Sequence, residues 1–337
     1  MSTIKEQVIS YILKLIHAND KKILSKTLEA FDGVVSKSTI YNYLKELCEN
    51  DIIRKDGSSY YLVSSEFIFA YDNIDLGEDR IFSRDIEPLF EGCSKNVLSA
   101  WRYAFTEMMN NAIEHSRATS IIVTVRKNAL QTTLYISDNG IGIFKNIQEY
   151  VIKENNQDLS LKECASLLFA GKFTTAKSMH SGEGIFFTSH LMDKFIIFSD
   201  NIVFSRDNFS DKDPEYTKLE NGTLVVMSLN NQSKKTTREV FDRFSNIDDG
   251  FIKTQIPIAH VFSGAGPVSR SEARRLGELI VKFKEVDLDF SNVDEVGQAF
   301  VHELFIVWQN RNPDVMLNVL NANDDVDFMI KRVKNTK

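Results

Sequence analysis

Residues 104–116 read AFTEMMNNAIEHS, and residues 136–143 read ISDNGIGI. A third segment, residues 180–193, reads HSGEGIFFTSHLMD. The first has the spacing of an amphipathic helix, the second is the end of a strand followed by a turn, and the third places two glycines before a helical pattern. The order and the chemistry of the three segments together predict a site that holds a nucleotide.

The predicted helix carries a carboxylate and an amide on one side. Ala104, Met108 and Ala112 recur at helical spacing and predict its buried face, while Glu107 and Asn111 lie four residues apart and project together. A carboxylate can polarise water, and an amide oxygen can ligate Mg²⁺, whose coordination is usually completed by water and substrate phosphates. The alternative interpretation of this pair is a solvated polar face.

The second segment predicts a turn that a ligand could approach closely. Asp138 follows an apolar strand and could accept a hydrogen bond from an exocyclic amine such as that of adenine. Gly140 and Gly142 would let the backbone come close to the ligand. The alternative is a simple Asp-Asn-Gly turn without a ligand.

The third segment predicts a phosphate cradle. Gly182 and Gly184 precede a helical pattern, and backbone N–H groups at a helix N-terminus bind anions. The alternative interpretation of this glycine pair is a flexible loop.

The whole pattern is ExxxN, then DNGxG, then GxG before a helix, then a strand beginning at Gly222-Thr223, and it resembles the Bergerat-fold ATPases. That family includes gyrase B, a heat-shock chaperone, histidine kinases and MutL, and the NAIxH stretch is most similar to the anti-sigma-factor kinases. The resemblance covers roughly residues 80–230. It implies that Glu107 is a general base, Asn111 a Mg²⁺ ligand, Asp138 the residue that reads adenine, Gly140 and Gly142 the turn beneath the base, Gly182 and Gly184 the phosphate glycines, and Thr223 a residue near the adenine.

The same resemblance implies a lid over the phosphates within residues 165–181. Gly171 could act as its hinge, and Lys172, Lys177 and His180 could reach phosphate oxygens. The alternative is that both lysines are solvated.

Residues 1–64 predict three helices and a hairpin, with Ser36 as the N-cap of the third helix and an Asp-Gly turn in the hairpin. This segment resembles a winged helix-turn-helix, a module whose third helix enters the major groove of DNA. The module has a net charge of only +1, which is little for duplex binding, so a protein-docking or dimerisation role stays open. The residues that would contact DNA are Lys37, Ser38, Thr39, Tyr41, Asn42, Arg54 and Lys55.

Residues 65–92 predict a connector that contains a short strand, and residues 93–232 predict the ATP-binding domain. From residue 250 to residue 337 the pattern alternates between strands and helices, beginning with a strand over residues 256–261, which predicts a sheet flanked by helices. The stretch VDLDFSNVDEVGQAF resembles the STAS fold of anti-anti-sigma factors, in which a serine at the helix start accepts phosphate. Residues 295–299 lack a hydroxyl there, and Ser269 is more simply an N-cap.

The bulk properties set the broad class. The chain has 337 residues, a net charge of −7 and a pI of about 5.5, so nothing in its overall charge suggests a protein that coats nucleic acid. Three cysteines without metal or disulfide spacing, and no long apolar run, lead us to expect a cytoplasmic protein that does not enter the membrane.

The sequence therefore predicts an α+β multidomain protein: a winged helix, a Bergerat α/β sandwich and a STAS-like α/β domain. We expect a homodimer that binds ATP and Mg²⁺, hydrolyses ATP slowly, binds duplex DNA, and meets a protein partner through the STAS-like domain. Two alternatives stay open, a serine or histidine protein kinase and a nucleotide-gated interaction factor in defence or stress.

Overall fold

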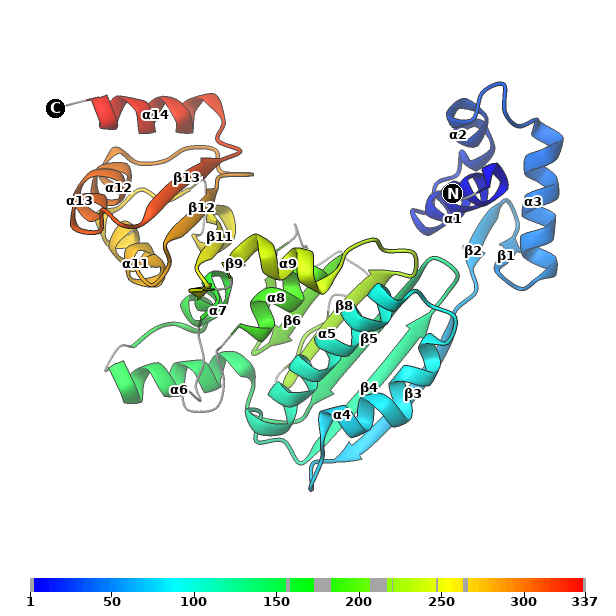
Figure 1. The fold of residues 1–337 in the computed structure, drawn as a ribbon, viewed down its shortest axis with the longest axis horizontal. Helices are drawn as coiled ribbons and strands as arrows, with labels where there is room; N and C mark the ends of the chain where they lie inside the picture. Colours follow the sequence, from blue (N-terminus) through cyan, green and yellow to red (C-terminus); the bar gives the residue numbers. More distant parts are fainter. Residues whose placement is uncertain are drawn as a thin grey trace.

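The computed structural model describes residues 3–155, 158–172, 183–206, 217–219, 221–246, 248–262 and 266–335. Along the sequence, an N-terminal helical module leads into a central sheet with its helices, and a smaller sheet with its own helices follows (Figure 1).

Residues 3–62 form the three helices and the hairpin that the sequence predicts. The Ser36 hydroxyl accepts the Thr39 N–H at 3.1 Å and caps the third helix, whose Ile40, Leu44 and Leu47 are buried. Gly57 has a φ of 55° in the hairpin turn. The elements are α1 (Ile4–His17), α2 (Ile23–Ala30), α3 (Lys37–Glu49), β1 (Ile53–Asp56) and β2 (Ser59–Leu62).

Among the described residues, the central sheet has six antiparallel strands in the order β3-β4-β5-β8-β6-β7. Alternation places Ile121, Val123 and Val125 in the core, while Ile122 on the other face is 46% exposed. The predicted connector supplies the edge strand β3, only two residues after the hairpin of the first module. The strands are β3 (Ser65–Asp72), β4 (Ser120–Lys127), β5 (Gln131–Asp138), β6 (Lys194–Ser199), β7 (Ile202–Ser205) and β8 (Thr223–Asn230).

One face of this sheet is covered by helices, of which α5 lies along the strands (Figure 1). Its Trp101 and Phe105 are fully buried against the sheet, and Phe105 packs on Phe82 with 5.5 Å between the ring centres. The helical elements here are α4 (Glu78–Ile81), the π-helix η1 (Phe82–Ile86), the 3-10 helix η2 (Glu87–Phe90), α5 (Lys95–Glu114), α6 (Ile143–Asn155), α7 (Leu161–Ala170) and α8 (Gly184–Leu191).

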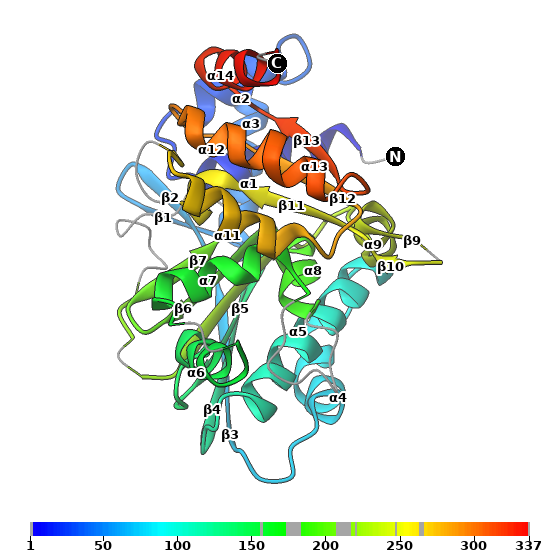
Figure 2. The same cartoon turned by 90° about the vertical axis from the view of Figure 1, so that its left-hand side faces the viewer.

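The C-terminal module contains the parallel sheet β11-β12-β13, with α11 and α12 on one face (Figure 2). Ser269 caps α11, as the sequence predicts, by accepting the Glu272 N–H at 3.2 Å. The segment from residue 237 comprises α9 (Thr237–Phe244), β9 (Ser245–Asn246), β10 (Gly250–Phe251), β11 (Lys253–Pro257), α10 (Ile258–Val261), α11 (Arg270–Ile280), β12 (Glu285–Asp289), α12 (Gln298–His302), the π-helix η3 (Glu303–Trp308), α13 (Gln309–Arg311), β13 (Met316–Leu320) and α14 (Asp324–Asn335).

The predicted strand over residues 256–261 is wrong after Pro257. Proline has no N–H to donate to a neighbouring strand, and Pro257 instead precedes the helical turn α10. The true strand begins earlier, at Lys253. Lys253 and Gln255 alternate with Thr254 and Ile256 in this strand. Because these two residues are polar, the search for an apolar run did not recognise where the strand begins.

The central domain and the C-terminal module share one hydrophobic cluster. Phe186 and Phe187 of α8 and Ala170 of α7 lie in the same cluster as the core of the C-terminal sheet. The Thr254 hydroxyl donates to the Ala170 carbonyl at 2.7 Å, and this bond is buried. At the end of α7, Gly171 packs against Phe251.

Replacing Gly171 with alanine should destabilise this junction. Its φ of 72° with ψ of −175° is a conformation essentially restricted to glycine, and an added Cβ would lie 2.7 Å from a ring carbon of Phe251. The matched control is Gly250→Ala, because Gly250 has a φ of 70° but open space around it. We expect a loss of about 2–4 kcal/mol for Gly171→Ala against about 1 kcal/mol for Gly250→Ala in calorimetry. Equal thermal midpoints would contradict the packing role.

Candidate nucleotide site

Glu107 lies where α5 meets α8. Its side chain is half-buried, and a Cβ added to Gly184 would overlap its Oε2 atom. Gly184 is the first residue of α8, so the carboxylate lies beside the N-terminus of that helix, where backbone N–H groups favour negative charge. The predicted base and one predicted phosphate glycine are therefore brought together, and Gly184 also has a packing reason to be glycine.

Asn111 is half-buried one turn further along α5, and its backbone carbonyl accepts the His115 N–H at 3.1 Å near the helix end. Within the described ranges, no three His, Cys, Asp or Glu side chains lie close enough together to hold a metal ion. The amide oxygen of Asn111, together with phosphate and water oxygens, would be a ligand set that suits Mg²⁺.

Asp138 is a buried acceptor at the end of β5. One carboxylate oxygen accepts the Gly140 N–H at 2.8 Å, and the backbone and hydroxyl of Thr223 also donate to the carboxylate. Burial raises the pKa of Asp138 to about 6, and these hydrogen bonds oppose the rise. A buried carboxylate of this kind could accept a hydrogen bond from an exocyclic amine.

Thr223 begins β8 directly opposite Asp138 in the sheet. Its hydroxyl oxygen accepts the Ile143 N–H at 3.0 Å, so the residue joins the end of β5 to the start of α6. Gly222 precedes it with a φ of 78° and packs on the Asp138 carbonyl. The predicted pair of Asp138 and Thr223 therefore forms one hydrogen-bonded unit.

The two glycines after Asp138 are required by close packing. A Cβ on Gly140 would overlap the Ser116 carbonyl at the end of α5. Gly142 has a φ of 89°, and an added Cβ would lie 2.6 Å from the carboxylate of Asp200. The turn is thereby held between α5 and the turn that joins β6 to β7.

That β6–β7 turn carries residues that the sequence did not single out. The Asp200 side chain is only 2% exposed and pairs with Lys145 at 2.8 Å. The Ser199 hydroxyl donates to the Gly222 carbonyl at 2.9 Å. The Asp-Asn pair at residues 200–201 predicts a turn in the sequence, but it does not predict which part of the fold the turn packs against.

Lys172 lies against the C-terminal module, and its charge also acts on Glu183, the residue before Gly184. Its ammonium lies 4.9 Å from the ring centre of Phe283 and 5.4 Å from that of Phe251, both in the segment that forms the C-terminal module. Lys282 donates to the Lys172 carbonyl at 2.6 Å. The predicted phosphate contacts from Lys177, His180 and Gly182 lie outside the described residues.

In the N-terminal module, most predicted DNA contacts are on the surface. Thr39 is the half-buried exception, and its hydroxyl lies 2.8 Å from that of Ser36 within the helix cap. The Ser38 hydroxyl is also 2.7 Å from that of Ser36. The exposed members of the set are Lys37, Ser38, Tyr41, Asn42, Arg54 and Lys55.

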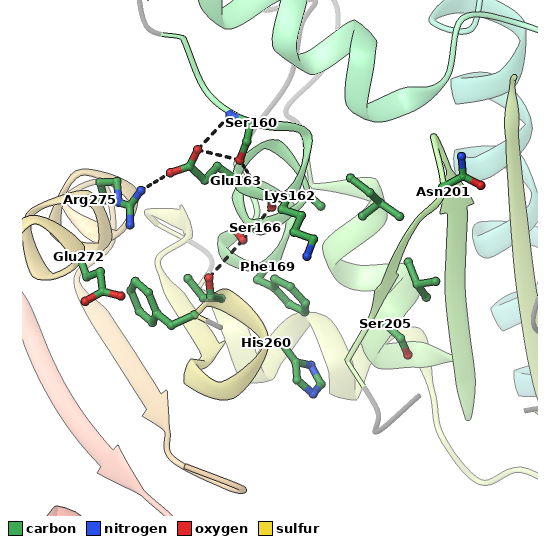
Figure 3. Close-up of a pocket in the computed structure, with 15 residues that line it drawn as sticks. Ser160, Lys162, Glu163, Ser166, Phe169, Asn201, Ser205, His260, Glu272 and Arg275 are labelled. Atoms are coloured by element: carbon green, nitrogen blue, oxygen red, sulfur yellow. Dashed lines mark hydrogen bonds and ion pairs between the residues drawn. The ribbon is translucent and has the colours of Figure 1, made fainter. Parts of the chain in front are cut away.

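A separate pocket of about 540 Å³ lies at the junction with the C-terminal module (Figure 3). Side chains of α7 and β7 face α10 and α11 across it, and an ion pair between Glu163 and Arg275 ties α7 to α11. The Ser166 hydroxyl and the Val261 carbonyl are 3.5 Å apart. None of the residues predicted for nucleotide binding lines this pocket, so it belongs to the module junction.

Two segments of the chain match models of known families. Residues 97–233 match the histidine kinase-, DNA gyrase B- and HSP90-like ATPases, and residues 272–327 match a STAS-like domain of unknown function. The chain contains an ATPase domain of this first family, known as the GHKL ATPases. This GHKL domain spans Glu107, Asn111, Asp138 and Thr223, and it is an ATP-binding domain followed by a STAS-like domain. No curated protein matches the chain.

Of the helices in the described part of the chain, none combines the length and the apolar character needed to cross a membrane.

The buried carboxylate of Asp138 predicts a pH dependence of ATP affinity. Because its pKa is about 6, the stronger, charged acceptor forms as pH rises from 5 to 7, and affinity should rise with it. Asp138→Asn should bind ATP more weakly by about 1–3 kcal/mol at pH 7, because a buried hydrogen bond is mispaired. Calorimetric titration at several pH values measures both effects.

The phosphates of ATP titrate in the same way with either protein, so Asp138→Asn is the control that separates this effect from the ionisation of Asp138. Its affinity should lack the rise centred near pH 6. Parallel pH profiles for the two proteins would remove Asp138 from the site.

Proposed function

We propose that this protein is an ATP- and Mg²⁺-dependent regulator that hydrolyses ATP slowly and binds duplex DNA through its N-terminal module. Two contacts carry the proposal. The first is the contact of Glu107 with the N-terminus of α8, and the second is the buried, hydrogen-bonded pair of Asp138 and Thr223. The first would face the phosphates and the second the adenine.

Hydrolysis needs a base beside the γ-phosphate. In the proposed reaction, water adds to the γ-phosphorus, its proton passes to the Glu107 carboxylate, and the bond to the bridging oxygen breaks to give ADP and phosphate. When bound, Mg²⁺ would neutralise charge on the phosphates, with Asn111 as its protein ligand. A protein that only binds ATP would not need Glu107 at this place.

The positions that the STAS-like resemblance suggests as phosphoacceptors do not favour the kinase alternative. Residues 295–299, where the STAS-like resemblance would place a phosphoacceptor, contain no hydroxyl side chain. Ser269 is engaged in a helix cap, with its hydroxyl 2.8 Å from Glu272. A kinase would need a separate substrate protein.

DNA binding is supported by the surface of the N-terminal module. A winged helix would contact DNA through its third helix and its hairpin, and Lys37, Tyr41 and Asn42 of α3 and Arg54 and Lys55 of the hairpin are exposed for such contacts. The module adjoins the ATPase sheet, because β2 leads within two residues into β3 and Leu130 packs in the N-terminal core. A change in the sheet on ATP binding would therefore reach the module, and a homodimer would double its small positive charge.

Glu107→Gln should retain ATP binding and lose about 100-fold or more in turnover, the usual scale for a general base. Asn111→Ala should instead lose the Mg²⁺ dependence of binding. Phosphate release measured with γ-labelled ATP checks both variants and also tests the kinase alternative. Label that stays on protein would favour a kinase, and a wild type without turnover would leave a binding switch.

Duplex binding should be sensitive to salt and should change when ATP is added. Replacing Arg54 and Lys55 with alanine should weaken binding to every sequence, whereas replacing Asn42 should alter sequence preference. The matched control replaces Lys14 and Lys21 with alanine. Both are exposed in the same module, and replacing them removes the same charge. Fluorescence anisotropy that detects no duplex with or without ATP would favour a protein-docking module.

A further inference from the structure

The β6–β7 turn places a buried carboxylate against the end of the candidate site that contains Asp138. The turn consists of Asp200 and Asn201, whose φ values of 54° and 59° are those of a two-residue hairpin turn. Asparagine tolerates this backbone as well as aspartate does, so the turn alone does not require a charge at Asp200. The Asp200 side chain is only 2% exposed, and a charge held out of water in this way is unfavourable unless it is paired.

The Asp200 carboxylate contacts the turn that follows Asp138. A Cβ added to Gly142 would lie 2.6 Å from Oδ2 of Asp200, and the Gly140 N–H of the same turn donates to Asp138 at 2.8 Å. Oδ1 of Asp200 pairs with the ammonium of Lys145 at 2.8 Å. Lys145 is the third residue of α6, where the helix N-terminus also favours a carboxylate. Asp200 therefore holds this turn together with the start of α6.

The residue before Asp200 reaches the other side of Asp138. The Ser199 hydroxyl lies 3.0 Å from Oδ2 of Asp200 and 2.9 Å from the Gly222 carbonyl, within hydrogen-bond distance of both. Gly222 packs on the Asp138 carbonyl and leads into β8, which pairs with β5 at this point. The carboxylate of Asp200 is thus connected to both backbone segments that flank Asp138.

We propose that Asp200 is a positioning residue for the nucleotide base: its ion pair with Lys145 fixes the two segments that flank Asp138 and so sets where the Asp138 carboxylate meets adenine. This inference rests on the contact between Asp138 and adenine proposed above. Adenine presents an exocyclic amine to such an acceptor, whereas guanine presents a carbonyl oxygen, which a carboxylate repels. The preference for ATP over GTP therefore depends on how closely Asp138 is held in place.

The test is calorimetric titration of the full-length protein with ATP and with GTP in the presence of Mg²⁺. Asp200→Asn keeps the turn and removes the charge. Its ATP affinity should fall about 10-fold and its GTP affinity less than about 2-fold, because a misplaced acceptor loses the contact that distinguishes the bases. The matched control is Glu149→Gln, which removes an ion pair with Arg117 at 3.0 Å from the same helix and should keep the base preference of the wild type.

Lys145→Met tests the same pair from its exposed partner. The Lys145 side chain is 45% exposed, so its replacement leaves no cavity in the core. It does leave the buried carboxylate without its cation, and ATP affinity should fall further than in Asp200→Asn. The double variant should bind ATP no more weakly than Asp200→Asn, because the unpaired charge is gone.

Equal losses of ATP and GTP affinity in Asp200→Asn would overturn the positioning role, as would a base preference equal to that of Glu149→Gln. Additive losses in the double variant would overturn the role of the ion pair. If Asp138→Asn loses the preference for ATP while Asp200→Asn keeps it, this inference fails and the proposed adenine contact stands. A wild type that binds ATP and GTP equally would overturn both.

Discussion

Helix α8 has to fit two neighbours at once, and much of the remaining structure depends on how it does so. At its first residue, the absence of a side chain on Gly184 admits the Glu107 carboxylate from α5. One turn later, Phe186 and Phe187 enter the cluster shared with the C-terminal core. Because interiors are close-packed, neither contact can shift without affecting the other. The helix that would face the phosphates is thus held in place by the STAS-like side of the molecule.

The opposite end of the candidate site is governed by a buried charge. Asp138 is held by Gly140 and Thr223, yet burial still raises its pKa to about 6. The sign of this shift means that ionisation of Asp138 destabilises the folded state as pH rises through that value. An exocyclic amine placed against the carboxylate would favour the charged form and offset this cost. Ligand binding would then stabilise the fold as well as complete the site.

Local patterns predicted most elements correctly. The N-cap at Ser36, the strand ending at Asp138 and the amphipathic face of α5 each depend on neighbours close in sequence, and the structure contains all three. The strand over residues 256–261 was wrong because Pro257 ends it, and the polar residues Lys253 and Gln255 masked where it begins. The sequence analysis missed Asp200. This residue lies in the β6–β7 turn and packs against Gly142, which is far from it along the chain.

The sequence by itself predicted which residue types would carry nucleotide chemistry and in which order the modules follow, since helix spacing, glycine turns and strand alternation are set within a few residues. Only the tertiary structure decided that Gly184 admits Glu107 and that Lys172 lies over Phe251 and Phe283. Most of these contacts join segments far apart along the chain. Their partners are chosen by packing and burial in three dimensions, which no local pattern records.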